Sequence, residues 1–179
     1  MLIGKLTHIR PLDDGDLESL YSWYNDPEFS YWVSGNWPPA TMLRREEIER
    51  KMYEEDEYRY AIIDKQGQLI GTVGYDEINI PARSARLFVG IGSKEHWGRG
   101  YGFDALAIFI QFLFRQWNFH RLTAETWQKN TRALSCYQKL GFVIEGTLRE
   151  AYYVNGEYCD GIILGLLRKD CILTNYEVL

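Results

Sequence analysis

Three glycines at alternate positions, Gly98, Gly100 and Gly102, come just before an amphipathic helical pattern and could bind a phosphate. Glycine leaves no side chain in the way, so successive N–H groups can point into one concavity. The start of the following helix adds partial positive charge, and Arg99 could add a charge-assisted hydrogen bond. The alternative is a glycine-rich turn that only joins a strand to a helix. The spacing fits neither the dinucleotide fingerprint nor a Walker loop.

The residues before this loop are expected to form the central strand. Leu87, Val89 and Ile91 alternate with smaller or aromatic neighbours, as in a strand with two different faces. Gly90 and Gly92 within or beside this strand indicate either a bulge or a place where another backbone comes close.

The other elements follow from apolar spacing, capping residues and turn signals. Between the central strand and the next strand lies an amphipathic helix, which predicts a parallel, right-handed crossover. The fold class is therefore α/β (α+β), with a mixed, mostly antiparallel sheet of about seven strands and flanking helices in a single domain, residues 1–179. The expected strands are 5–10, 58–64, 69–79, the central strand, 121–127, 142–154 and 157–167; the expected helices are 13–26, 41–52, 101–117 and 131–140, with a loop or short helical turn over 28–41.

Composition limits the range of functions. The chain has 179 residues, a net charge of −5 and 46% hydrophobic residues, which fits a globular domain and argues against nucleic acid as a partner. The longest apolar run, residues 105–114, is too short to cross a membrane. Three cysteines without metal-ligand spacing, and first residues that do not read as a secretory leader, predict a reduced, cytoplasmic protein without a metal.

Three segments, in this order, resemble the GNAT N-acetyltransferases, in particular the branch of ribosomal-protein N-terminal and spermidine acetyltransferases. The resemblance covers nearly the whole chain. The glycine loop is similar to the family's Q/R-x-x-G-x-G/A motif, except that Trp97 stands at the usual Gln/Arg position. The matching segments are Trp97-Gly98-Arg99-Gly100-Tyr101-Gly102, then Asn130-Thr131-Arg132-Ala133 with Tyr137 and Lys139-Leu140-Gly141-Phe142, then Glu145-Gly146 with Arg149 and Asn155-Gly156.

The resemblance implies acetyl-CoA as the donor and a primary amine as the acceptor. It also implies a GNAT fold in which the central strand and its parallel neighbour splay apart, with the pantetheine arm lying in the gap. Asn130 would bond the arm from the other side, or simply cap its helix. The residues implied in acetyl-CoA binding are Val89, Ile91, Trp97, Gly98, Arg99, Gly100, Tyr101, Gly102 and Asn130; no metal is implied.

The resemblance also suggests the catalytic groups. Tyr137 occupies the position of the family's usual general acid, which protonates the leaving thiolate; its alternative role is core packing. Glu77 is the candidate general base and Asp76 is its competitor; a structural role at the surface is the third possibility. Neighbours on a strand point to opposite faces, so only one of the two carboxylates can face the cleft. His96 should lie on the phosphate side. Cys136, beside Tyr137, should point elsewhere on the helix, and direct transfer needs no covalent intermediate.

The expected function is transfer of an acetyl group to a small cationic amine, such as a polyamine. The negative net charge and the acidic residues Glu54 to Glu57 favour such an acceptor, although an acidic run is most often a solvated helix end. The alternatives are a protein N-terminal acetyltransferase acting on a peptide N-terminus and a catalytically silent acyl-CoA-binding module. The sequence leaves the oligomeric state open, a homo-oligomer included.

Overall fold

Eight strands form one sheet in the order β1-β2-β3-β4-β5-β6-β8-β7 in the computed structural model, which describes residues 1–34, 42–52 and 57–173. All neighbouring pairs are antiparallel except β5 and β6, which are parallel. The mixed, mostly antiparallel GNAT-type sheet is therefore confirmed. The strands are β1 (Leu2–Ile3), β2 (Thr7–Pro11), β3 (Tyr58–Asp64), β4 (Leu69–Asn79), β5 (Ser84–Ile91), β6 (Arg121–Trp127), β7 (Val143–Val154) and β8 (Glu157–Leu167).

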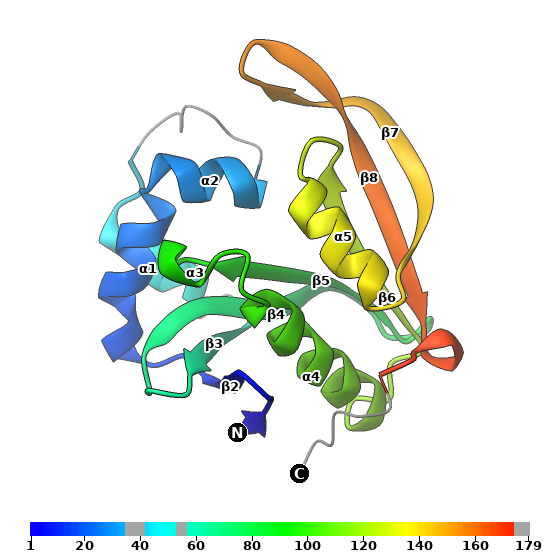
Figure 1. Ribbon diagram of the computed structural model, residues 1–179, viewed down its shortest axis with the longest axis horizontal. Coiled ribbons are helices and arrows are strands. Elements are labelled where there is room, and N and C mark those ends of the chain that lie inside the picture. Colours follow the sequence, from blue (N-terminus) through cyan, green and yellow to red (C-terminus); the bar gives the residue numbers. More distant parts are fainter. Residues whose placement is uncertain (35–41, 53–56, 174–179) are drawn as a thin grey trace.

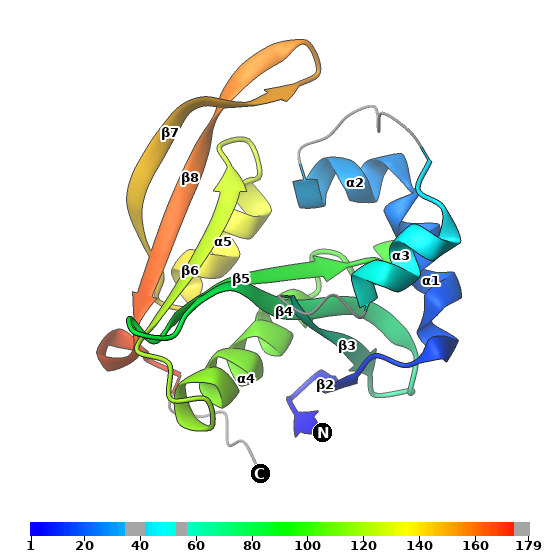
Figure 2. The same cartoon turned by 180° about the vertical axis from the view of Figure 1, so that it is seen from behind.

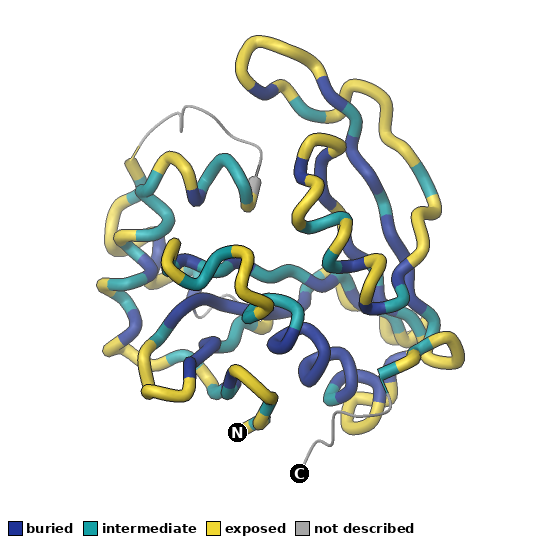
Figure 3. Tube along the Cα trace, in the orientation of Figure 1, coloured by how far each residue is buried: buried dark blue, intermediate teal, exposed yellow. Residues whose placement is uncertain are grey.

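The helices divide between two sides of the sheet. The long α4 lies against β1, β2, β4 and β5 and contacts α5, and these two helices cover the main core (Figure 1). Figure 3 shows that α4 is largely buried and that β7 is exposed over much of its length, whereas its partner β8 is mostly buried beyond its first residues. A separate apolar cluster joins α1 to α3 through Leu20, Ile48 and Met52. The helices are α1 (Leu17–Tyr24), α2 (Pro27–Ser34), α3 (Arg45–Met52), α4 (Tyr101–Arg115) and α5 (Thr131–Lys139).

The first third of the chain differs in two details from the expected elements. The first strand is preceded by a short strand, β1, so the sheet has one strand more than predicted. The expected loop or short helical turn after Pro27 begins with the eight-residue helix α2, since proline suits the first helical position and the Asp26 side chain accepts a hydrogen bond from Phe29 N at 2.9 Å. The predicted cap Thr41 lies outside the described residues.

Gly90 and Gly92 allow close packing rather than a bulge. A Cβ built on Gly92 would overlap the ring of Trp23 in α1, and one on Gly90 would lie 3.1 Å from Phe29 in α2. A Cβ on Gly71 in β4 would overlap the carbonyl oxygen of Gly90, so the close backbone contact between β4 and β5 depends on Gly71, whereas Gly90 and Gly92 make room for side chains. The register shift in the β4–β5 ladder lies elsewhere, between Asp76 and Asn79.

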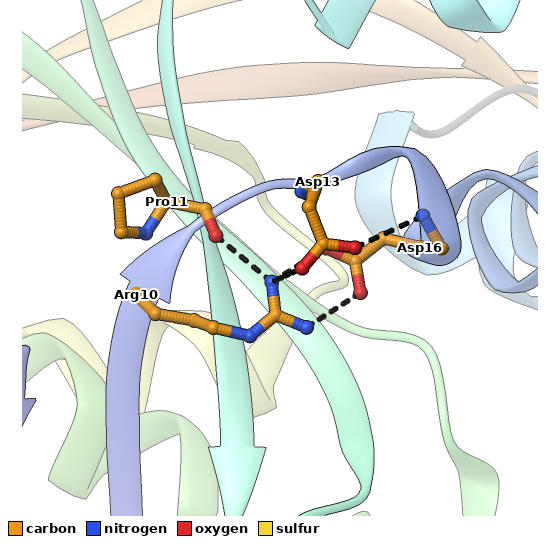
Figure 4. A network of polar contacts seen from close by, with 5 residues as sticks. Arg10, Pro11, Asp13 and Asp16 are labelled. Atoms are coloured by element: carbon orange, nitrogen blue, oxygen red, sulfur yellow. Dashed lines mark hydrogen bonds and ion pairs between the residues drawn. The ribbon is translucent and has the colours of Figure 1, made fainter.

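Arg10 joins the end of β2 to the start of α1 (Figure 4). Its two terminal nitrogens donate to the two carboxylate oxygens of the buried Asp16, each at 2.7 Å, and one of them also donates to the Pro11 carbonyl oxygen. Asp16 in turn accepts a hydrogen bond from the backbone N–H of Asp13. The hydrogen bond to Asp16 raises the pKa of Arg10. This bidentate pair fixes the direction in which α1 leaves the sheet.

Asp104, in the first turn of α4, ties the helix to the amino-terminal segment. Its carboxylate accepts hydrogen bonds from the backbone N–H groups of Lys5, Leu6 and Thr7 at 2.9–3.0 Å, and from the Thr7 hydroxyl at 2.7 Å. The side chain is buried, and a Cβ on Gly4 would overlap it. A carboxylate near a helix start is also favoured by the helix dipole. The start of α4 is therefore anchored to β2.

Asp104→Ala is expected to lower the free energy of unfolding by about 2 to 4 kcal/mol, because four donors lose one charged acceptor. Urea unfolding followed by circular dichroism measures this loss. Asp170→Ala, an exposed aspartate in the turn after β8, is the matched control and should change stability by less than about 0.5 kcal/mol. Equal stability of the two variants would show that the Asp104 contacts contribute nothing.

Candidate active site

The parallel strands β5 and β6 separate part of the way along their length. Their pairing runs from Ser84 opposite Arg121 to Leu87 opposite Ala124 and ends there. Both strands continue, β5 for four residues to Ile91 and β6 for three residues to Trp127. Figures 1 and 2 show β5 turning away from β6 beyond the shared segment. The backbone groups of β5 on this side can therefore pair with an extended ligand, as an added strand would.

A cavity of about 320 Å³ lies at this split, with walls from α1, α2, α5 and the strands β3 to β7. Leu87 to Gly90 line it from β5, and Glu125 and Thr126 line it from β6. From α2, the aromatic side chains of Phe29 and Trp32 contribute. The predicted gap between the splayed strands is thus a cavity large enough for a small molecule.

The cavity has a helix side and an open side. Ala85 and Leu87 are buried in the core covered by α4, so Arg86 between them points to the opposite face of the sheet. In the same way, buried Ala124 belongs to the helix side and its neighbour Glu125 to the open side. Charged residues therefore line the open side, while α5 covers the helix side.

The glycine loop has the conformation that a phosphate-binding turn needs. Gly98 and Gly100 have φ of 71° and 87°, which favour glycine, and α4 begins at Tyr101 directly after them. A Cβ on Gly98 would meet nothing within 4 Å. The loop is exposed, and it leads into the fifteen-residue helix α4, whose first N–H groups have no hydrogen-bond partner within a helix and can bind an anion. The residues present therefore fit the pyrophosphate of coenzyme A.

Trp97 fixes this loop to the end of β5. Its indole nitrogen donates to the carbonyl oxygen of Ile91 at 2.6 Å. The Arg132 guanidinium lies 5.0 Å from the centre of the Trp97 ring, and the Lys94 ammonium lies 5.9 Å from it. These contacts explain how tryptophan can stand where the family has Gln or Arg: its role in this structure is to hold the backbone.

Asn130 caps α5 and reaches α2. Its side-chain oxygen accepts from the backbone N–H of Ala133 at 3.3 Å, and its amide nitrogen donates to the carbonyl oxygen of Trp32 at 2.9 Å. Asn130 is buried and lines the cavity. The helix-cap role is therefore observed, and a hydrogen bond to the pantetheine arm stays a prediction.

Tyr137 reaches the cavity from the helix side. It lies on α5, is 4% exposed and contacts Phe142 edge-on, with 5.3 Å between ring centres. Burial raises its pKa above the ordinary value for a phenol, so the hydroxyl keeps its proton over a wide pH range. Burial also raises the pKa of the neighbouring Cys136 thiol to about 11, and Cys136 is outside the cavity lining. A phenol is thus the proton donor that α5 offers to this cavity.

Asp76, and not Glu77, faces the cavity. The Asp76 carboxylate receives two hydrogen bonds from Arg86, at 2.8 and 2.9 Å, and the two side chains line the cavity together. Glu77 has a φ of 47° at the register shift in β4; its side chain is 63% exposed and its carboxylate lies 2.8 Å from another Arg86 nitrogen. Because its backbone is left-handed, Glu77, the candidate general base, does not line the cavity. The rule of opposite faces fails here because both carboxylates turn to one arginine.

His96 lies beside the glycine loop and outside the cavity lining, as expected. Its Nδ1 is 2.7 Å from the Ser93 hydroxyl and its Nε2 is 3.5 Å from a carboxylate oxygen of Asp64. The ring meets Tyr101 edge-on.

Within the described residues, no cluster of three or more metal-ligating side chains is found. None of the helices among the described residues is long and apolar enough to span a membrane.

The sequence analysis missed several cavity residues on the open side. Arg59 on β3 lies over the ring of Phe88 and donates to the Tyr24 hydroxyl at 2.5 Å and to the Thr72 hydroxyl at 3.2 Å. Arg59 also forms an ion pair with Glu57. Alternation along the strands could have placed Arg59 on the open face, but only the tertiary structure brings it to the cavity.

Comparisons with known proteins agree with this geometry. The family model of the acetyltransferase (GNAT) domain matches residues 7–143. The chain is similar to a spermidine N(1)-acetyltransferase of Vibrio cholerae serotype O1, with 32% identity over 85% of this chain and 87% of that protein.

Solved structures of this relative's kind have the same fold. A spermidine N-acetyltransferase from Vibrio cholerae in complex with CoA and spermine superposes with a TM-score of 0.81 at 28% identity, covering 92% of this chain and 96% of that one. A dodecameric spermidine N-acetyltransferase from the same organism gives a TM-score of 0.75 at 30% identity, covering 91% and 94%. The chain therefore belongs to the GNAT acetyltransferase family and is an acyltransferase that uses acetyl-CoA.

Proposed function

We propose that this enzyme transfers the acetyl group of acetyl-CoA to the primary amine of a small cationic acceptor, with Tyr137 as the general acid. The observation that carries the proposal is the position of Tyr137 in a cavity at the split between β5 and β6. Acetyl-CoA supplies the acetyl group as a reactive thioester. The similar enzyme from Vibrio cholerae has a structure with CoA and spermine, which supports this class of acceptor.

The proposed acetyl-CoA site extends from the glycine loop to the cavity. The N–H groups of residues 98–102 bind the pyrophosphate, and Arg99, which is exposed, adds a charged contact. Backbone groups of Val89 and Ile91 pair with the pantetheine arm, and Asn130 bonds it from α5. One lone pair of the Ile91 carbonyl oxygen is already used by Trp97.

The proposed chemistry needs one proton donor and one route for proton loss. As the amine nitrogen bonds to the carbonyl carbon and the C–S bond breaks, Tyr137 gives its phenolic proton to the leaving sulfur, and the proton released by the new amide nitrogen restores the phenol. An alkylamine has a pKa near 10, so it must lose a proton before it attacks the carbonyl carbon. We assign this loss to water on the open side of the cavity, beside Asp76, because Glu77 lies outside the cavity lining and cannot contact the amine directly.

The charges of the cavity suit a small cation better than a peptide. Glu57, Asp76 and Glu125 contribute three negative charges to the lining, against two positive charges from Arg59 and Arg86. On the α2 side the aromatic residues narrow the space that an extended peptide N-terminus would need. Of the predicted acidic run, Glu57 is described and lines the cavity; residues 54–56 lie outside the described residues.

We also propose that the protein is cytoplasmic and assembles as a homo-oligomer. The free thiols of Cys136, Cys159 and Cys171 support a reducing compartment. Assembly is supported by the dodecameric relative and by β7, an edge strand with exposed apolar side chains such as Val143 and Tyr153.

Gly100→Val is expected to raise the dissociation constant of acetyl-CoA at least tenfold, because a β-branched side chain both strains a left-handed residue and intrudes on the phosphates. Isothermal titration calorimetry measures the affinity. Gly156→Val is the matched control: Gly156 has a φ of 82° in the β7–β8 turn, lies outside the cavity lining and should leave affinity unchanged. Equal affinity of the Gly100 variant and the wild type would place the phosphate site elsewhere.

Tyr137→Phe is expected to reduce kcat at least tenfold while the affinity for acetyl-CoA changes by less than about twofold. Because burial raises the Tyr137 pKa, wild-type kcat should not fall between about pH 8 and pH 10 through loss of this proton. Stopped assays of thiol release across this range provide both measurements. Tyr158→Phe removes an exposed hydroxyl as control. Wild-type turnover by the Tyr137 variant would exclude the residue from the mechanism.

The acceptor class is tested by thiol release with acetyl-CoA and a panel of amines. The panel contains spermidine, 1,4-diaminobutane, an amino sugar and a peptide with a free N-terminus. We expect kcat/KM for the small cationic amines to exceed that for the peptide at least tenfold, because the cavity is small and carries net negative charge. A preference for the peptide would favour the N-terminal acetyltransferase. Binding of acetyl-CoA without turnover of any amine would favour the silent module.

A further inference from the structure

Glu125 lies at the point where β5 and β6 separate. It is the first residue of β6 after the last parallel pair, Leu87 opposite Ala124. Its neighbours Ala124 and Thr126 are buried, whereas Glu125 is exposed and points to the open face, where it lines the cavity. A ligand that reaches the split from the open side meets this carboxylate.

Glu125 also differs from the other two carboxylates of the cavity. Glu57 forms an ion pair with Arg59, and Asp76 receives two hydrogen bonds from Arg86. Their negative charge is therefore balanced within the protein. Glu125 accepts a hydrogen bond from a neutral phenol and forms no ion pair within the described residues, although Arg86 attracts it from a longer distance. Among the described lining residues, Glu125 thus carries the negative charge that a cationic ligand can use.

Tyr152 holds one oxygen of this carboxylate. Its hydroxyl donates to Oε1 of Glu125 at 3.1 Å, and the residue lies on β7 opposite Cys159. Burial and the nearby Glu125 raise the pKa of Tyr152 to about 12, so the phenol remains a donor at neutral pH. For Oε2 no hydrogen-bond partner is found in the part of the chain that the structure describes.

We propose that Glu125 binds a second cationic group of the acceptor, one that does not react, and that Tyr152 is its positioning residue. This inference rests on the proposed function. An ammonium group carries three N–H donors and can pair with the open oxygen, whereas an alkyl end cannot. Phe88 and the Tyr152 ring give the chain between the two amines an apolar wall. The acceptor class is therefore a linear diamine or polyamine rather than a monoamine.

The test compares 1,4-diaminobutane with butylamine, which has the same chain length but lacks the second amine. Glu125→Gln should raise KM for the diamine at least tenfold and leave KM for butylamine and for acetyl-CoA within about twofold, with kcat little changed. Glu157→Gln, an exposed glutamate outside the cavity lining, is the matched control. Thermal melts show whether each variant is folded.

Tyr152→Phe should raise the diamine KM about threefold without changing kcat, because the carboxylate remains but loses its positioning bond. Tyr153→Phe, its exposed neighbour on β7, should have no effect. The inference would be overturned if Glu125→Gln raised KM equally for 1,4-diaminobutane and butylamine, or for neither. Turnover by this variant would still support the proposed acetyl transfer.

Calorimetry with coenzyme A present provides a readout that needs no turnover. The wild type should bind 1,4-diaminobutane at least tenfold more tightly than butylamine, and Glu125→Gln should remove this difference. Equal binding of the two amines by the wild type would overturn the role of Glu125. Tight diamine binding without any acetyl transfer would reject the proposed reaction and still support the Glu125 site.

Discussion

The end of the β5–β6 pairing is the constraint on which the rest of the site depends. Up to Leu87 and Ala124 the two strands satisfy each other's backbone groups, and beyond these residues they cannot. An unsatisfied strand edge inside a protein is costly unless a ligand or water pairs with it. The same separation opens a passage between the two faces of the sheet, so that Tyr137 from the helix side and charged residues from the open side reach one cavity. A fully paired sheet would keep Tyr137, the proposed acid, apart from the charged residues of the open side.

The distribution of charge follows from this two-sided arrangement. The helix side is apolar and buried, which keeps the Tyr137 phenol protonated. The open side holds carboxylates and arginines whose charges largely cancel in pairs, such as Asp76 with Arg86. Pairing lowers the cost of placing several charges around a small cavity, and it makes the few unbalanced charges decisive for the choice of ligand.

Local signals predicted the parts of the site that local backbone chemistry determines. The glycine loop and the helix after it were recognisable because residue type and spacing define them, whereas Tyr137 was singled out by the resemblance to the GNAT family. The choice between Asp76 and Glu77 depended on a left-handed residue at a register shift, which alternation cannot reveal. The contact of Asn130 with α2 joins segments 98 residues apart, and no local pattern encodes it. Short-range patterns thus predicted the glycine loop and the helix that follows it, while the charged side of the cavity required the tertiary fold.

The glycine loop illustrates why a backbone site needs side chains elsewhere. Residues 98–100 are exposed, and glycine gives them freedom that would cost binding energy if it were not restricted. Three contacts restrict it: Trp97 bonds the end of β5, His96 lies between Ser93 and the β3–β4 turn, and Asp104 ties the first turn of α4 to β2. Each contact comes from a residue outside the three glycines. The N–H groups of the proposed phosphate site are therefore preorganised by neighbours on rigid elements, and the loop needs no bulky side chain of its own to hold its conformation.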